Sequence, residues 1–325
     1  MRLTTLLTAA ALCVALTATA AHAAQPAATA NFPEKPVRLV IGSAPGSGPD
    51  IISRALSERL FGAWGQRIVV DSRVGKAGVL SAELVLRSPA DGYTWMMLTS
   101  QLMVATAVYP DVKFNLEKDF SSLSLIGTVS FVLVTNNDLP VKSLRELIEY
   151  AKKNPLKYGS AGTGASEHLS GTLFNKLTGN DMLHVPYKGV SEAVTATMSR
   201  EVNLTYGVVP AVLGAIQSGR VRALGVTGPK RNFLLPDVPS ISEVVPGYQT
   251  LAWYSVVAPT GTPDAILNKA SLEIAKEVKV PQFGEQLKGL GLEIVGSTRA
   301  ELDKFRAEQR RQITEIVKLS GVDVK

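Results

Sequence analysis

Two short segments rich in glycine and serine could bind an anion through their main-chain N–H groups. The first is Gly42-Ser-Ala-Pro-Gly-Ser-Gly-Pro-Asp50, and the second is Ser160-Ala-Gly-Thr-Gly-Ala-Ser166. Each follows a short apolar segment and precedes apolar residues at helical spacing, which indicates a strand, a loop and a helix start. The unpaired N–H groups and the positive dipole end of a helix start favour a negatively charged ligand. We therefore predict two anion-binding loops.

The candidate ligand contacts come from these loops and from the later segment His184-Val-Pro-Tyr-Lys-Gly189. Glycine lets the main chain approach a ligand closely, serine offers a hydroxyl, and Asp50 is placed to cap the helix that follows. The predicted ligand-binding residues are Ser43, Ala44, Pro45, Gly46, Ser47, Gly48, Asp50, Ser160, Gly162, Thr163, Gly164, Ser166, His168, Tyr187 and Lys188.

Two of these predictions have a structural alternative. The glycines of segment 42–50 are also compatible with a tight strand-to-helix turn that binds nothing, and Tyr187 and Lys188 either face the ligand or brace the loop. The first loop lacks the Gly-Lys-Ser/Thr of a phosphate-binding P-loop and the G-x-G-x-x-G spacing of a dinucleotide fingerprint. A nucleotide is therefore not the expected ligand.

The sequence shows no catalytic motif. Of its three histidines, His22 lies near the N-terminus, and only His168 and His184 belong to the segments described above. A hydrolase or lyase that uses either as a base is the alternative from another class, but no HExxH, Gly-x-Ser-x-Gly or triad pattern accompanies them. We expect His168 to orient the second loop or reach the ligand, and His184 to be structural. We predict neither an enzyme nor a metal or cofactor site.

The N-terminus has the pattern of a secretory signal peptide, residues 1–23. Arg2 precedes an apolar stretch, and Ala21-His22-Ala23 is a small-x-small cleavage pattern. The single cysteine, Cys13, lies in this stretch, so the mature chain would lack thiol chemistry and disulfides. The formal net charge is +6, with Arg2 included. The basic residues form no stripe of the kind that nucleic-acid binding needs. We expect a soluble, exported protein that binds no nucleic acid.

The remaining sequence alternates apolar strand-like segments with helical patterns, which indicates an α/β fold with mainly parallel sheets. Two long apolar segments, 123–134 and 251–258, are candidates for strands that cross between two lobes. We therefore predict a discontinuous first domain, residues 31–130 plus 255–325, with a second domain, residues 131–254, inserted into it. Ligands of such sheets bind at the carboxyl ends of the strands, so one loop on each lobe predicts a cleft between the lobes.

Several motifs, taken in order, resemble the substrate-binding receptors of tripartite tricarboxylate transporters, the Bug or TctC type. The resemblance extends over nearly the whole mature chain and is carried by Phe32-Pro-Glu-Lys-Pro-Val-Arg38, Ala44-Pro-Gly-Ser-Gly-Pro-Asp50, Ala90-Asp-Gly-Tyr-Thr94, Gly159-Ser-Ala-Gly-Thr-Gly-Ala-Ser-Glu-His-Leu169, His184-Val-Pro-Tyr-Lys-Gly189, Gly219-Arg-Val-Arg-Ala-Leu224, Pro236-Asp-Val-Pro239 and Trp253 through Pro263.

The resemblance implies a two-lobed periplasmic binding protein fold, type II-like, in which loops 43–50 and 160–168 hold a carboxylate. It also implies a membrane permease with a large and a small subunit as the partner. The chain departs from the family pattern at Ser47, which replaces glycine, at Pro49, which replaces Ser or Thr, at Ala196, which replaces Asp, and in the segment Ser72-Arg-Val-Gly-Lys-Ala-Gly78. These departures leave the choice of carboxylate open.

Three functions follow in order of preference. The first is a monomeric periplasmic receptor that binds a di- or tricarboxylate, an amino acid or an aromatic acid and delivers it to the transporter. The second is an extracytoplasmic sensor whose bound form contacts a signalling protein, since both functions need the same closing cleft. The third is the hydrolase or lyase already mentioned.

Overall fold

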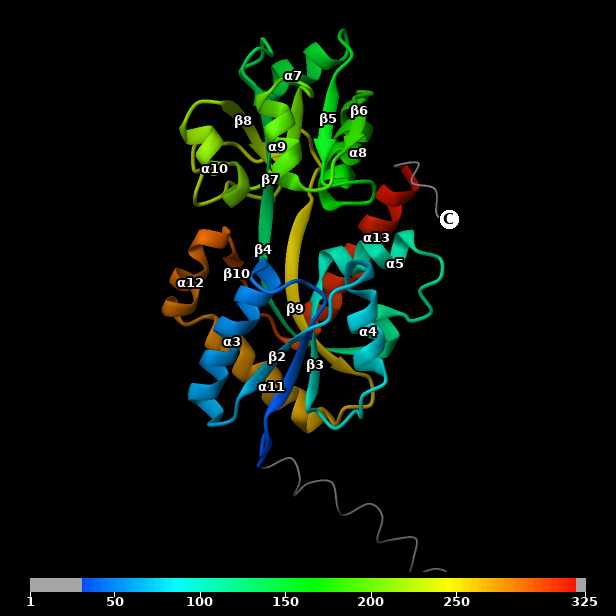
Figure 1. The fold of residues 1–325 in the computed structure, drawn as a ribbon, viewed down its shortest axis with the longest axis vertical. Helices are drawn as coiled ribbons and strands as arrows, with labels where there is room; N and C mark the ends of the chain where they lie inside the picture. Colours follow the sequence, from blue (N-terminus) through cyan, green and yellow to red (C-terminus); the bar gives the residue numbers. More distant parts are fainter. Residues whose placement is uncertain (1–30, 320–325) are drawn as a thin grey trace, which may run out of the picture.

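The computed structural model describes residues 31–319, so the predicted signal peptide lies outside the described residues. The described chain forms two lobes with a waist between them, and two long strands run through the waist (Figure 1). Each lobe has parallel strands flanked by helices, and the crossing strands pair antiparallel with them. The predicted two-lobed α/β fold is confirmed.

The first lobe is built on three parallel strands. β1 (Val37–Ile41) lies between β2 (Ile68–Ser72) and β3 (Thr94–Thr99). β1 is buried almost throughout because its VRLVI sequence packs against helices on both faces of the sheet. The helices of this lobe are α3 (Gly48–Trp64), α4 (Val79–Leu86), α5 (Ser100–Val108), α6 (Leu116–Asp119), α11 (Asp264–Val278) and α12 (Pro281–Leu287), with the short helices η1 (Lys76–Gly78) and η3 (Lys288–Leu290).

The second lobe repeats this design. Strand β5 (Lys157–Ser160) pairs in parallel with β6 (Leu183–Pro186) and with β7 (Leu204–Val208). β8 (Val221–Val226) completes the sheet by pairing with a crossing strand. The remaining helices of the lobe are α7 (Leu144–Ala151), α8 (Ser166–Thr178), α9 (Val190–Met198), α10 (Val209–Gln217) and η2 (Ile241–Glu243).

The two crossing strands are β4 (Phe120–Asn136) and β9 (Leu251–Pro259), which pair antiparallel with each other. β4 also pairs with β10 (Glu293–Ile294) in the first lobe and with β7 and β8 in the second. The predicted boundaries at residues 130/131 and 254/255 fall inside these two strands. The division into domains at those residues stays a prediction.

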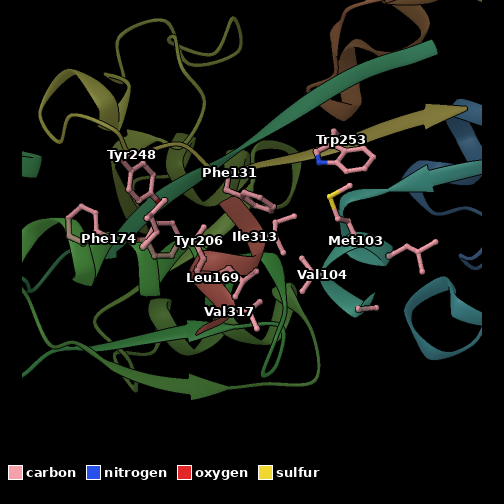
Figure 2. Packing of buried hydrophobic residues seen from close by; sticks show 14 of the residues in the cluster. Met103, Val104, Phe131, Leu169, Phe174, Tyr206, Tyr248, Trp253, Ile313 and Val317 are labelled. Carbon is pink, nitrogen blue, oxygen red and sulfur yellow. The ribbon is translucent and has the colours of Figure 1, made fainter. Parts of the chain in front are cut away.

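The last helix, α13 (Arg299–Leu319), joins the lobes a third time. It packs on α5 and β4 of the first lobe and on α8 of the second. Its Ile313 and Val317 share one buried cluster with Met103 and Val104 from the first lobe and Leu169 from the second (Figure 2). The helix start that loop 160–166 leads into is therefore held against both lobes.

Candidate functional site

A cleft of about 530 Å³ lies between the lobes at the carboxyl ends of their parallel strands. Segments after β1, β2 and β3 form its wall in the first lobe, and the segment after β5 and the end of β7 form its wall in the second. The lining residues are Gly42, Ser43, Ala44, Ser47, Pro49, Val74, Gly75, Lys76, Ala77, Thr99, Ser100, Gln101, Phe131, Ala161, Ala165, Ser166, Glu167, Val208, Ala252 and Tyr254.

The first predicted loop is stabilised by its own acidic residue. Asp50 lies in the first turn of α3, where its carboxylate accepts a hydrogen bond from the Gly46 N–H (2.9 Å) and pairs with Arg54 (3.0 Å). The hydrogen bond from Arg54 lowers the pKa of Asp50 below its ordinary value. The N-cap of α3 is Ser47, so Asp50 supports the helix start from inside the first turn and does not occupy the expected capping position.

Of the predicted ligand-binding residues in this loop, Ser43, Ala44 and Ser47 line the cleft, and Gly42 and Pro49 of the same segment line it too. The Ser47 hydroxyl is buried and has no hydrogen-bond partner within residues 31–319. Buried polar groups are nearly always paired, so an unpaired hydroxyl on a residue that lines the cleft is a candidate ligand contact, which it would make by rotating toward the cleft. Pro45, Gly46, Gly48 and Asp50 lie outside the lining set.

The second predicted loop uses much of its polar capacity internally. The Ser160 hydroxyl contacts the main chain of Gly162, both its carbonyl (3.0 Å) and its N–H (3.1 Å), and lies 2.6 Å from His184 Nε2. The Gly164 N–H donates to His168 Nδ1 (3.0 Å). Of the predicted residues here, Ser166 lines the cleft, whereas Ser160, Gly162, Thr163, Gly164 and His168 do not.

His168 faces away from the cleft and orients the loop. Its ring stacks on that of His184, with centroids 3.8 Å apart, and both rings line a separate hollow of about 520 Å³ on the second lobe. Burial, with the neighbouring His184 charge, lowers the pKa of His168 to about 4, and burial also lowers the pKa of His184. Both rings are therefore neutral near pH 7, and His168 Nδ1 remains an acceptor for the Gly164 N–H.

Tyr187 and Lys188 brace the second lobe rather than the cleft. The Tyr187 hydroxyl donates to Glu201 (2.8 Å), and the Lys188 N–H donates to Glu192 (3.1 Å). Burial, with the Glu201 carboxylate, raises the pKa of Tyr187 to about 12. Neither residue is in the lining set.

The sequence analysis missed two segments of the first-lobe wall. One is Val74 to Ala77, in which Lys76 and Ala77 have φ angles of 46° and 53°. Such angles are unfavourable for residues other than glycine and recur at ligand sites. Lys76 forms an ion pair with Asp111 at the edge of the first lobe. The departures of segment 72–78 from the family pattern were the one signal in the sequence that could have drawn attention to this wall.

The other missed segment is Thr99 to Gln101, at the start of α5. Thr99 is the N-cap residue of that helix, and its hydroxyl accepts the Leu102 N–H (3.3 Å). A strand, a threonine and a helix start follow one another here, but the segment lacks the glycine-rich sequence that identified the two predicted loops. The starts of α3, α5 and α8 thus all contribute residues to the cleft, and their dipoles make it favourable for an anion.

Glu167 is the acidic side chain in this cleft lining. It lies in the first turn of α8, and the residue is only 7% exposed. Burial raises the pKa of Glu167 to about 7. The sequence analysis included Glu167 only within a motif and did not predict it as a ligand contact.

Other kinds of site find no support in the described part of the chain. Across residues 31–319, no helix is both long and apolar enough to span a bilayer. No set of three or more His, Cys, Asp or Glu side chains there is arranged to hold a metal ion. The cleft between the lobes is the candidate functional site.

The fold and this cleft define a two-lobed solute-binding protein of the periplasmic type. The family model for tripartite tricarboxylate transporter family receptors, TctC, matches residues 52–322, and the chain belongs to this family. The resemblance inferred from the motifs is confirmed. The family is one of binding receptors, not of enzymes.

Individual relatives agree with this assignment. The chain is 36% identical over 285 residues to a protein from the tcbD-tcbE intergenic region of Pseudomonas sp. strain P51, which covers 86% of this chain and 85% of the relative. It superposes on the R. palustris protein Rpa4515 with adipate at a TM-score of 0.75 and 32% identity, covering 89% and 98% of the two chains. MatC from Rhodopseudomonas palustris with bound malate gives a TM-score of 0.71 at 26% identity, covering 88% and 100%.

Proposed function

We propose that this chain is a monomeric periplasmic receptor that captures a small organic carboxylate and delivers it to a tripartite tricarboxylate transporter. The observation that carries the proposal is the cleft in which the starts of α3, α5 and α8 face one another from two lobes. Adipate and malate, bound by two similar proteins, support a dicarboxylate as the ligand class.

The geometry is adequate for useful affinity. A carboxylate that accepts N–H and hydroxyl hydrogen bonds gains about 1.5–3 kcal/mol for each, with about 0.3–2 kcal/mol from each helix start. Micromolar binding needs about 8 kcal/mol. Three or four such contacts give a gross free energy of that order, and desolvation and ordering take up part of it. The unpaired Ser47 hydroxyl and the start of α8 at Ser166 are the contacts we assign to the carboxylate.

The rest of the proposal concerns location and partner. Cleavage after Ala23 would leave a mature protein that begins at Ala24, which N-terminal sequencing of the exported protein tests directly.

Delivery to a permease is tested by uptake of radiolabelled malate or adipate in cells with and without the neighbouring transporter genes. Uptake that persists without a permease would leave the receptor with another partner.

A panel of acids tests binding itself. We expect malate, succinate, adipate or citrate to raise the melting temperature of the purified protein and to bind in calorimetry with micromolar affinity. Stabilisation only by sugars or by cations would contradict the proposal. Turnover of a bound acid would instead support a hydrolase or lyase.

One pair of variants locates the site. Ser166 is the first residue of α8, and Ala165 before it is extended (φ −68°, ψ 158°), so proline fits at position 166 and removes only the N–H and the hydroxyl. Ser166→Ala removes the hydroxyl alone. We expect Ser166→Pro to lose at least about tenfold more affinity than Ser166→Ala, since one charge-assisted hydrogen bond exceeds 1.4 kcal/mol. Equal affinities in the two variants would remove the start of α8 from the site.

A further inference from the structure

Glu167 is placed where a bound carboxylate is expected. It follows Ser166 directly in the first turn of α8, and both residues line the cleft. Glu167 is 93% buried. Its carboxyl group forms no hydrogen bond or ion pair with another side chain within residues 31–319, and its one donor is its own main-chain N–H. The open space beside this carboxyl group is the cleft itself.

The surrounding charges leave Glu167 uncompensated. The elements packed against α8 and the facing wall of the cleft carry other titratable or charged groups. They are Lys157 and Tyr158 of β5, His168 and Lys176 of α8, His184 of β6, Tyr206 of β7, Tyr254 of β9, Asp50 and Arg54 of α3, Lys76 (paired with Asp111), and Arg299, Glu301, Asp303, Lys304, Arg306, Glu308, Arg310, Arg311, Glu315 and Lys318 of α13. None of them shifts the pKa of Glu167, which burial raises to about 7 against the opposing effect of its own main-chain N–H.

The rest of the cleft favours an anion. Three helix starts and Lys76 contribute positive potential, and Glu167 is the single acidic residue in this lining. An anionic ligand bound at Ser166 therefore lies beside a carboxyl group. Two carboxylates at hydrogen-bonding distance cannot both stay ionised, because like charges at that range raise the pKa of one strongly.

We propose, on the basis of the function proposed above, that Glu167 binds the ligand as a neutral acid and donates a hydrogen bond to the ligand carboxylate. The proton comes from solvent, and no covalent bond changes. Each dicarboxylate would then be captured together with one proton. Glu167 is thus a specificity-determining residue. It favours a ligand that places an ionised carboxylate beside it over a ligand that places a hydrogen-bond donor there.

A ligand with an ammonium group at this position would have the opposite behaviour. Such a ligand would keep Glu167 ionised. At a pH at which Glu167 is protonated in the free protein, binding would therefore release that proton. The pH dependence of binding therefore separates the two cases by its sign.

The test is calorimetric titration with malate and with adipate between about pH 6.5 and pH 8.5, where both acids are fully ionised. We expect the affinity of the unmodified protein to fall roughly 20-fold across this window, since the protonated fraction of a group with a pKa near 7 falls by that factor. Titrations in buffers of different ionisation enthalpy should show that the complex takes up close to one proton per bound ligand at the upper end of this pH range.

Two variants sharpen the test. Glu167→Gln keeps the shape of the neutral acid and a donor, so it should flatten the pH profile and bind more tightly than the unmodified protein at about pH 8.5. Glu149→Gln is the matched control, because Glu149 is exposed on α7 and pairs only with Lys152 at its surface. This control should keep the pH profile of the unmodified protein.

Three outcomes overturn the inference in distinguishable ways. Binding of either acid with no proton uptake and no pH dependence would refute it and leave the proposed function standing. Affinity that rises with pH, with a preference for aspartate over malate, would show that Glu167 receives an ammonium group. Failure of every acid to bind both the unmodified protein and Glu167→Gln at any pH would refute the proposed function as well.

Discussion

The starts of α3 and α8 each carry an acidic residue in the first helical turn, yet the two carboxyl groups differ in their protonation. Asp50 accepts the Gly46 N–H and pairs with Arg54, and its pKa is lowered. Glu167 has no partner among the described side chains, and burial raises its pKa to about 7. A helix dipole alone thus does not decide the charge of a carboxyl group at its start. The Arg54 guanidinium lowers the pKa of Asp50, whereas Glu167 is buried with only its own main-chain N–H as a donor.

This difference suggests two roles. The first loop is held rigid by a carboxylate that is already satisfied. The second presents a carboxyl group and a helix start to the cleft, while His168 holds the loop from behind. If Glu167 acts as proposed, the second-lobe wall makes ligand binding depend on ligand charge and on pH, whereas the first-lobe wall has no comparable acidic side chain in the cleft lining.

The largest expected effect concerns stability at high pH. Burial raises the pKa of Glu167 in the folded state to about 7. The contribution of this side chain to the free energy of unfolding is therefore fully present below about pH 4.5 and is lost as the pH rises through about 7. Glu167→Gln should therefore raise the free energy of unfolding by up to about 3 kcal/mol at pH 8 and leave it nearly unchanged near pH 4.5. Urea unfolding at the two pH values measures this, and equal effects at both would show that Glu167 is not desolvated.

Asp50→Asn should have the opposite sign. The lowered pKa of Asp50 gives stability that is present above about pH 4 and is lost as the pH falls through the native-state value. Replacing the carboxylate should lower the free energy of unfolding at pH 7 by about 1.5–3 kcal/mol, because a charge-assisted hydrogen bond is lost. Arg54→Gln is the control and should lose less stability than Asp50→Asn, since the Arg54 side chain is 57% exposed.

His168→Ala tests the support behind the second loop. It leaves the Gly164 N–H without its acceptor and opens a space beside His184, so we expect a loss of about 2 kcal/mol in unfolding free energy and weaker binding of the acid. His168→Asn offers an oxygen near the position of Nδ1 and should recover part of both. Unchanged affinity in His168→Ala would show that the loop keeps its shape without the imidazole.

The smallest expected effect is that of salt. A ligand enclosed between two lobes is poorly screened, so its affinity should change by less than about twofold between roughly 0.01 M and 0.15 M ionic strength. Calorimetry at the two concentrations measures it. A steep dependence would place the acid on an exposed surface instead.

The sequence predicted the elements better than the side-chain directions. Segments 123–134 and 251–258, predicted to cross between the lobes, are observed within β4 and as β9, because a long apolar run is a local signal. Thr298 and Glu301 have the spacing of a capping pair, which is another local signal, and the Thr298 N–H donates to Glu301 (2.8 Å).

The direction of His168 was not accessible in the same way. Successive residues of a helix point about 100° apart, so Glu167 faces the cleft whereas His168 faces the second hollow. Which of them meets the ligand depends on how α8 packs against the other lobe. The same holds for Lys76, whose segment joins the cleft through tertiary packing alone. The residues that contact the ligand, and the exact domain boundaries, stay predictions.

A crystal structure of the protein grown with malate or adipate tests the central claim most directly. We predict a ligand carboxylate within hydrogen-bonding distance of the Ser166 N–H and of the Ser47 hydroxyl, with the Glu167 carboxyl group beside it. An acid found instead in the hollow beside His168 and His184, or a cleft that stays empty while the acid binds in solution, would contradict it.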